Sequence, residues 1–155
     1  MTNKIIYSHD AFVLDINRIG MWLRDVQFTP DLIVGILRGG SVPAVYLSHE
    51  LDCPVRIIEW STRDSNKRDT YSLDQVAAMA ESGTKVLIID DIVDSGTTMQ
   101  EIKSRLFDTK NNILYVALWY NPSQITTIHY WCNAIDRSID DRWVYMPWEK
   151  LPQDL

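Results

Sequence analysis

Three long apolar runs constrain the fold of this chain more than any other feature. They are DLIVGIL (31–37), KVLIIDDIV (85–93) and ILYVALWY (113–120), and PVRIIEW (54–60) is a shorter candidate strand. Apolar character that is continuous rather than alternating is typical of strands buried on both faces. Helical spacing follows Asp10, a candidate N-cap, and recurs from Pro43 and over 99–107. We therefore expect an α/β fold with a mostly parallel sheet flanked by helices on both faces.

Length and charge restrict the function classes. The 155 residues suit one domain, 1–155, without an obvious linker, and the formal charge of −6 argues against a nonspecific nucleic-acid binder. No stretch approaches the ~20 apolar residues of a membrane span, and the first residues lack the apolar core of a signal peptide. Two distant cysteines form no zinc pattern, which favours a reducing, cytoplasmic compartment.

The segment VLIIDDIVDSGTT (86–98) gathers polar groups at the end of a predicted buried strand. They are Asp90, Asp91, Asp94, Ser95, Gly96, Thr97 and Thr98. Ligands bind at the carboxyl ends of strands in open α/β sheets, and a glycine with hydroxyl groups at a helix start suits a phosphate monoester. Adjacent acids would repel that phosphate unless they accept hydrogen bonds from sugar hydroxyls or hold a hard cation such as Mg²⁺. The alternative is simple helix capping beside solvated strand-end charges.

Two further segments carry weaker signals. In LRGGSVP (37–43), Gly39 and Gly40 can expose N–H groups to an anion, and Arg38 supplies a planar donor fork, although a plain turn would look the same. STRDSNKRDTY (61–71) has almost no apolar content and reads as a loop, for which a solvated surface is the simplest interpretation.

VLIIDDIVDSGTT resembles the phosphoribosyl-pyrophosphate signature of the type I phosphoribosyltransferases. The resemblance implies that Asp90 and Asp91 face the ribose hydroxyls, directly or through Mg²⁺ on Asp91, and that 95–98 hold the 5′-phosphate. Asp94 would exchange a proton with a ring nitrogen of the base. The resemblance also implies pyrophosphate binding by the turn, with a cis peptide between Leu37 and Arg38. The polar loop 61–71 would form a flexible lid. The residues implied for pyrophosphate are Leu37, Arg38, Gly39, Gly40, Lys67 and Arg68.

Within that family the chain is most similar to the short bacterial xanthine-guanine enzymes, nearly end to end. The late W-x-x-x-P-W at 143–148 implies a small C-terminal hood, about 121–150, where Trp143 stacks on a purine and Val144 offers backbone groups. One departure matters. Those enzymes carry a lysine before the proline of the 119–122 turn, which donates to the purine 6-oxo group, whereas this chain has Asn121. An amide can donate or accept, and Asn-Pro is also a common turn, so the preferred base stays open.

We therefore expect a Mg²⁺-dependent purine phosphoribosyltransferase, which converts phosphoribosyl pyrophosphate and guanine, xanthine or hypoxanthine into a nucleoside monophosphate and pyrophosphate. The alternatives are the same reaction on another nucleobase, or a regulatory protein that senses phosphoribosyl pyrophosphate. The acidic charge and the lack of a basic arm count against a regulator acting on nucleic acid. A homo-oligomer, a dimer or tetramer, is expected from the resemblance.

Overall fold

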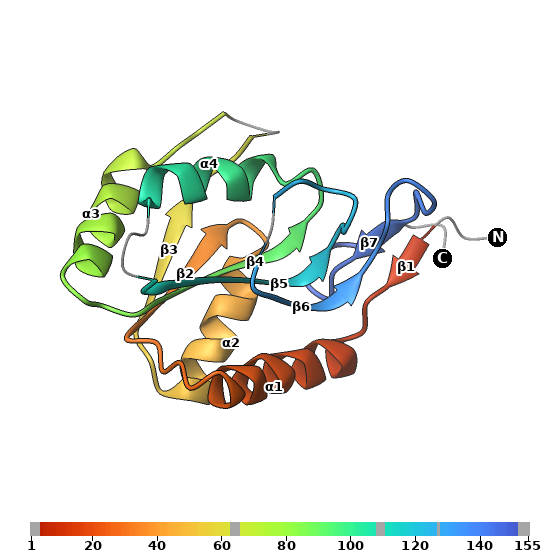
Figure 1. Ribbon diagram of the computed structural model, residues 1–155. Helices are drawn as coiled ribbons and strands as arrows, with labels where there is room; N and C mark the ends of the chain where they lie inside the picture. The colour runs from red at the N-terminus through yellow and green to blue at the C-terminus, as the bar shows by residue number, and fades with distance from the viewer. Residues whose placement is uncertain (1–3, 63–65, 108–110, 127, 152–155) are drawn as a thin grey trace.

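The centre of the fold is a parallel sheet of five strands in the order β3-β2-β4-β5-β6 (Figure 1). This computed structural model describes residues 4–62, 66–107, 111–126 and 128–151. The strands are β2 (Leu32–Leu37), β3 (Val55–Glu59), β4 (Val86–Val93), β5 (Ile113–Tyr120) and β6 (Tyr130–Ala134). The predicted mostly parallel α/β sheet is confirmed, whereas β6 has no counterpart among the predicted strands.

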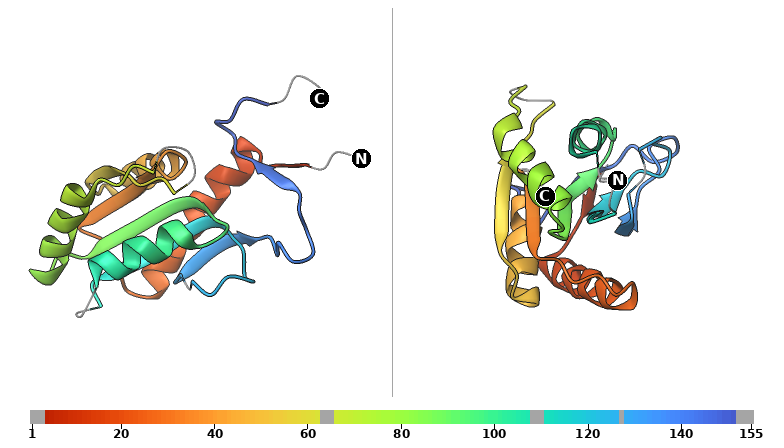
Figure 2. Two further views of the ribbon diagram at one scale, coloured as in Figure 1. Left: turned by 90° about the horizontal axis from the view of Figure 1, so that it is seen from above. Right: turned by 60° about the vertical axis from the view of Figure 1, so that its left-hand side comes forward.

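Helices cover both faces of this sheet. On one face lie α1 (His9–Asp25) and α2 (Ser41–Leu51), and on the other lie α3 (Thr70–Glu81) and α4 (Thr97–Leu106) (Figures 1 and 2). The core accordingly forms two clusters. Ile33 and Leu87 belong to the first, with α1 and α2, while Val34 and Ile88 belong to the second, with α3 and α4. Successive strand residues point to opposite faces, which explains why these strands are apolar throughout.

The helix starts differ in detail from the predictions. The side chain of Ser8, not Asp10, caps α1, because its Oγ accepts a hydrogen bond from the Ala11 N–H at 3.1 Å. Asp10 lies in the first turn, where a negative charge favours the helix dipole. Helix α3 was not predicted. It begins after Asp69, whose carboxylate accepts from the Ser72 N–H at 3.0 Å, so the polar loop ends before residue 70.

A small second sheet lies beyond the main one. Strand β1 (Lys4–Ile6) pairs in parallel with β7 (Trp143–Tyr145) (Figure 1). In this pair Ile5 stands opposite Val144. The Tyr7 N–H extends the pairing by donating to the Tyr145 carbonyl at 3.0 Å. The beginning of the described chain therefore supports a strand close to its end.

A buried carboxylate links this sheet to α1 and β6. Asp15 is 2% exposed and accepts from the Tyr7 hydroxyl and from Asn133 Nδ2, each at 2.6 Å, and from Arg18 Nη1 at 2.8 Å. Burial, followed by the hydrogen bond to Asp15, raises the pKa of Tyr7 above its ordinary value. None of the described helices is long and apolar enough to cross a membrane.

Candidate active site

A cleft of about 450 Å³ opens where the strand order reverses. The chain passes from β2 to β3 on one side and then to β4 on the other side of β2. The loops after β2 and β4 therefore diverge, which leaves a crevice at the carboxyl ends of these strands. Residues after β2, β3 and β4 and residues of β7 line it.

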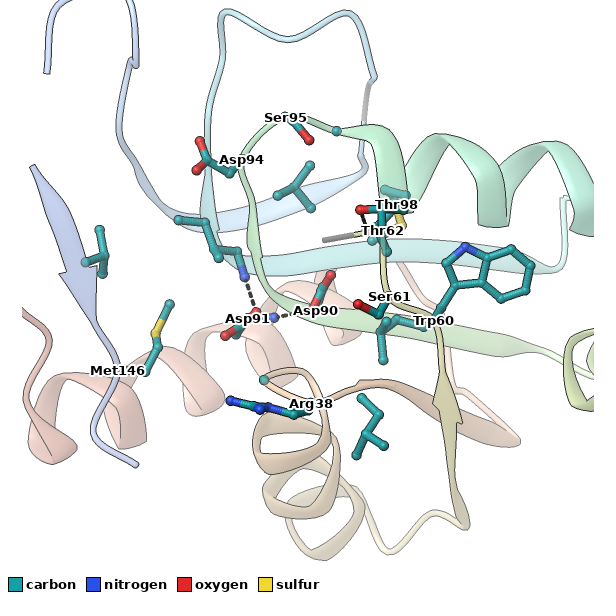
Figure 3. Close-up of a pocket in the computed structure, with 18 of the residues that line it drawn as sticks. Arg38, Trp60, Ser61, Thr62, Asp90, Asp91, Asp94, Ser95, Thr98 and Met146 are labelled. Atoms are coloured by element: carbon teal, nitrogen blue, oxygen red, sulfur yellow. Dashed lines mark hydrogen bonds between the residues drawn. The ribbon is translucent and has the colours of Figure 1, made fainter. Parts of the chain in front are cut away.

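Two adjacent carboxylates, Asp90 and Asp91, form the floor of the cleft (Figure 3). The Asp91 N–H donates to Asp90 Oδ1 at 2.9 Å, and the Ile92 N–H donates to Asp91 Oδ1 at 2.8 Å. Burial, and then the charge of Asp91, raises the pKa of Asp90 well above its ordinary value; burial also raises the pKa of Asp91. Within the described ranges, neither acid forms an ion pair with a lysine or arginine. A bound cation would relieve this repulsion.

The loop after β2 packs directly on these acids. Its peptide bond between Leu37 and Arg38 is cis, as the resemblance implied. Gly39 approaches Asp91 so closely that a Cβ atom on it would stand 1.9 Å from Asp91 Oδ2. Arg38 and Gly39 line the cleft, whereas Gly40 packs against the strands, with its would-be Cβ 2.7 Å from the Ile89 carbonyl. Both positions therefore require glycine, because a side chain on Gly39 or Gly40 would clash with the strand residues packed against it.

The start of α4 forms the next wall of the cleft. Gly96 adopts φ +78°, a conformation that L side chains rarely adopt, and the helix begins at Thr97. Ser95, Gly96 and Thr98 line the cleft, while Thr97 lies outside it and accepts from the Ser95 hydroxyl at 3.2 Å. The hydroxyl oxygens of Thr98 and Thr62 are 3.1 Å apart, which connects this wall to the loop after β3. A helix N-terminus with hydroxyl groups suits an anion.

The structure separates the two basic residues proposed for the lid. Lys67 lines the cleft, with its Nζ 3.7 Å from Glu59 Oε1. Arg68 lies outside it and binds Glu101 through two hydrogen bonds, Nε to Oε2 at 2.7 Å and Nη2 to Oε1 at 2.9 Å. Trp60 Nε1 also donates to Glu101. This arrangement favours Lys67 and does not support a ligand contact by Arg68; residues 63–65 of the predicted lid lie outside the described residues.

Strand β7 closes the cleft on the far side. Trp143 is 46% exposed and lines the cleft together with Val144 and Met146. In a parallel pair, alternate residues bond to the partner strand. Because the Tyr145 carbonyl accepts from Tyr7, the backbone groups of Val144 point away from β1. Trp143 also borders an adjoining cavity of about 530 Å³ with Trp148.

Asn121 does not face the cleft, contrary to the expected contact with a base. It is 1% exposed, and its Nδ2 donates to the Asp94 carbonyl at 3.1 Å. Its Oδ1 accepts from the Ser123 N–H and hydroxyl and from the Arg137 N–H at 3.2 Å. With its amide engaged in this way, Asn121 fits the alternative role of a turn residue.

Arg137 occupies the cleft instead, and the sequence pattern did not reveal it. Its Nε donates to Asp94 Oδ1 at 2.9 Å and its Nη1 donates to the Arg142 carbonyl at 2.5 Å. The side chain is only 19% exposed. It comes from the polar segment 135–142, where no spacing or motif distinguishes it from the neighbouring Arg142.

The fold and cleft define a parallel α/β protein with a cleft at the strand switch point, where proteins of this class bind ligands. The chain belongs to the phosphoribosyl transferase domain family, which matches residues 2–149. It is 28% identical over 121 residues to a xanthine-guanine phosphoribosyltransferase of Idiomarina loihiensis, covering 76% of this chain and 70% of that protein. Identity to the enzyme of the same name from Gluconobacter oxydans is 30% over 125 residues, covering 77% and 69%. The crystal structure of a purine phosphoribosyltransferase from Pyrococcus horikoshii superposes with a TM-score of 0.74 at 24% identity, covering 97% of both chains.

Proposed function

We propose that this protein is a purine phosphoribosyltransferase, which transfers the phosphoribosyl group of phosphoribosyl pyrophosphate to a purine base. One observation carries the proposal: a single cleft brings Asp90, Asp91 and Asp94 together with the loop at Arg38, the start of α4 and Trp143. The similarity to enzymes named xanthine-guanine phosphoribosyltransferases supports the same reaction.

In this proposal the acidic pair holds the ribose. Asp90 and Asp91 accept hydrogen bonds from the 2′ and 3′ hydroxyls, and Asp91 is the candidate Mg²⁺ ligand. Enzymes of this family generally use Mg²⁺ with phosphoribosyl pyrophosphate. The donor set fits, because two carboxylates without a cationic partner in the described residues are hard oxygen ligands. No group of three or more such side-chain ligands exists among those residues, so substrate oxygens would have to supply further ligands to the ion. Bound Mg²⁺ would neutralise charge on the departing pyrophosphate.

The phosphates occupy the two ends of the same floor. Ser95, Gly96 and Thr98 bind the 5′-phosphate at the start of α4, with Thr97 behind them. The loop formed by Leu37, Arg38, Gly39 and Gly40 binds the pyrophosphate, together with Lys67.

The base lies between Trp143 and the end of β4. Trp143 stacks on the purine ring, Val144 offers backbone groups to its edge, and Asp94 contacts its N7. The purine N9 forms a bond to C1′ as the bond from C1′ to the pyrophosphate oxygen breaks, and the proton on N7 passes to the Asp94 carboxylate. Positioning and this proton transfer are the contributions of the chain.

The predicted lid, about 61–71, ends in the structure where α3 begins at Thr70. Closure by this lid and by the hood, about 121–150, would exclude water from the ribose centre. We propose further that residues 1–155 form a single domain, as the length indicates, and that the protein is cytoplasmic, as the two distant cysteines indicate. A dimer or tetramer is proposed from the resemblance.

The test supplies Mg²⁺, phosphoribosyl pyrophosphate and one nucleobase at a time, and follows pyrophosphate release. Release with guanine, xanthine or hypoxanthine is expected. Release only with a pyrimidine would overturn the purine assignment, and release only with adenine would overturn the expected set of guanine, xanthine and hypoxanthine. No release with any base, alongside tight binding of phosphoribosyl pyrophosphate, would identify a sensor rather than an enzyme.

A further inference from the structure

Arg137 is a largely buried cation at the base end of the cleft. Its guanidinium contacts Asp94 on one side and the carbonyl of Arg142 on the other. Trp143 and Val144 follow Arg142 directly, so the guanidinium lies between the proton-transfer carboxylate and the proposed base platform. Its Nη2 has no hydrogen-bond acceptor among the described residues, although the side chain is only 19% exposed. Nη2 is not among the fully buried unpaired atoms of the described residues, so this donor is open to an acceptor that a ligand brings into the cleft.

One buried amide sets the spacing of the two groups. Asn121 Nδ2 donates to the backbone carbonyl of Asp94, while its Oδ1 accepts from the backbone N–H of Arg137. The carboxylate and the guanidinium are thus held side by side by their backbones as well as by their own 2.9 Å hydrogen bond. The cleft therefore presents a fixed acceptor next to a fixed donor.

This pattern matches one edge of a particular class of purine. In every purine, N7 and the substituent on C6 lie on the same edge. A 6-oxopurine that carries its proton on N7 shows a donor, N7–H, next to an acceptor, O6. Adenine places an amino donor at C6, where it would face the donors of the guanidinium.

We propose that Arg137 selects 6-oxopurines by donating to O6 while Asp94 contacts N7. This inference rests on the purine phosphoribosyltransferase function proposed above. It makes Arg137 a specificity-determining residue, and it makes Asn121 a positioning residue that holds the pair.

The test compares hypoxanthine with unsubstituted purine, which lacks the C6 oxygen, in the wild type and in Arg137→Met. The wild type should prefer hypoxanthine in kcat/KM. The ratio of the two values should fall by about 10-fold or more in Arg137→Met, because a hydrogen bond from a charged donor to a base edge discriminates by about that much. Arg137→Lys, which keeps a charged donor, should recover part of the ratio.

Arg105→Met is the matched control, since Arg105 forms an exposed pair with Asp74 away from the cleft, through hydrogen bonds of 2.8 Å. Its hypoxanthine-to-purine ratio should equal that of the wild type. If a thermal melt shows that Arg137→Met is not folded, the same ratio is measured in Arg137→Gln.

An unchanged ratio in a folded Arg137 variant, even with both rates lowered, would mean a structural role only and would overturn this inference alone. A wild type that releases pyrophosphate with no purine would overturn the proposed function and this inference together. Gain of adenine turnover in Arg137→Gln, whose amide can accept from the amino group, would support the proposal further.

Discussion

The contact between Gly39 and Asp91 makes Gly39→Ala a sharp test of the proposed site. Gly39 has no positive φ, so its backbone conformation suits alanine. The added methyl, however, would stand 1.9 Å from Asp91 Oδ2 and 2.2 Å from Asp91 Cγ. The substitution therefore acts almost entirely on the position of one carboxylate.

The size of the effect follows from this distance. Real Cβ contacts are essentially never shorter than 3.0 Å, so a 1.9 Å contact forces the carboxylate or the loop to move by roughly 1 Å. That movement would stretch the 2.8 Å hydrogen bond from the Ile92 N–H to Asp91 Oδ1. A misplacement of roughly 1 Å in a catalytic site can cost about 10²-fold in rate, and we expect a loss of that order in kcat/KM for phosphoribosyl pyrophosphate.

The assay is pyrophosphate release at saturating 6-oxopurine, beside a thermal melt of the same preparation. Gly20→Ala, in helix α1, is the matched control. Its new methyl would lie 3.8 Å from Leu51 and 3.9 Å from Glu50, which are ordinary van der Waals contacts. It should keep full activity and gain roughly 0.5–1 kcal/mol of stability. A folded Gly39→Ala protein with wild-type kcat/KM would refute the reasoning that this contact positions a catalytic acid.

Three other substitutions separate chemistry from stability. Asp94→Asn should lower turnover by about 10²–10⁴-fold while phosphoribosyl pyrophosphate still binds by calorimetry; equal losses would contradict a proton-transfer role. The pKa of Asp90 is raised above its ordinary value of 3.8 in the folded state. Folding therefore loses stability as the pH rises from 3.8 through the raised pKa, because the buried carboxyl must ionise. Asp90→Asn without ligands should therefore melt at a higher temperature than the wild type at neutral pH, with the difference vanishing toward pH 3.8; a constant difference would count against this. Tyr7→Phe should cost about 1–2 kcal/mol in urea unfolding because Asp15 loses one buried partner, and no change would show that the partner is dispensable.

The features of the fold that sequence predicted are those encoded locally. The runs that became β2, β4 and β5 are buried on both faces, so their composition alone indicates parallel strands. Strands β1 and β7 have three residues each and exist only because they pair with each other across most of the chain, a relation that periodicity cannot reveal. Helix α3 did carry a signal, since Leu73, Val76 and Ala80 have helical spacing after the Asp69 cap.

The residues of the candidate site also fall into those that local sequence predicts and those that it does not. The acidic segment and the glycine turn were predictable because their chemistry is contiguous in sequence and follows strands. Arg137 could not be predicted from the sequence, because its position depends on tertiary contacts with Asp94 and Asn121. The base contact of Asn121 was predicted because it stands where the similar enzymes carry a lysine, whereas the structure buries its amide against the Asp94 carbonyl.

The pairing of β1 with β7 also has a consequence for how the protein is made. Residues 4–6 leave the ribosome long before residues 143–145 exist to pair with them. The strands of the parallel core precede Trp143 in the chain, so the proposed sugar-phosphate site can form before the proposed base site is complete. A nascent or C-terminally shortened chain would therefore hold a partial site, able to bind the phosphorylated sugar before it can bind the base.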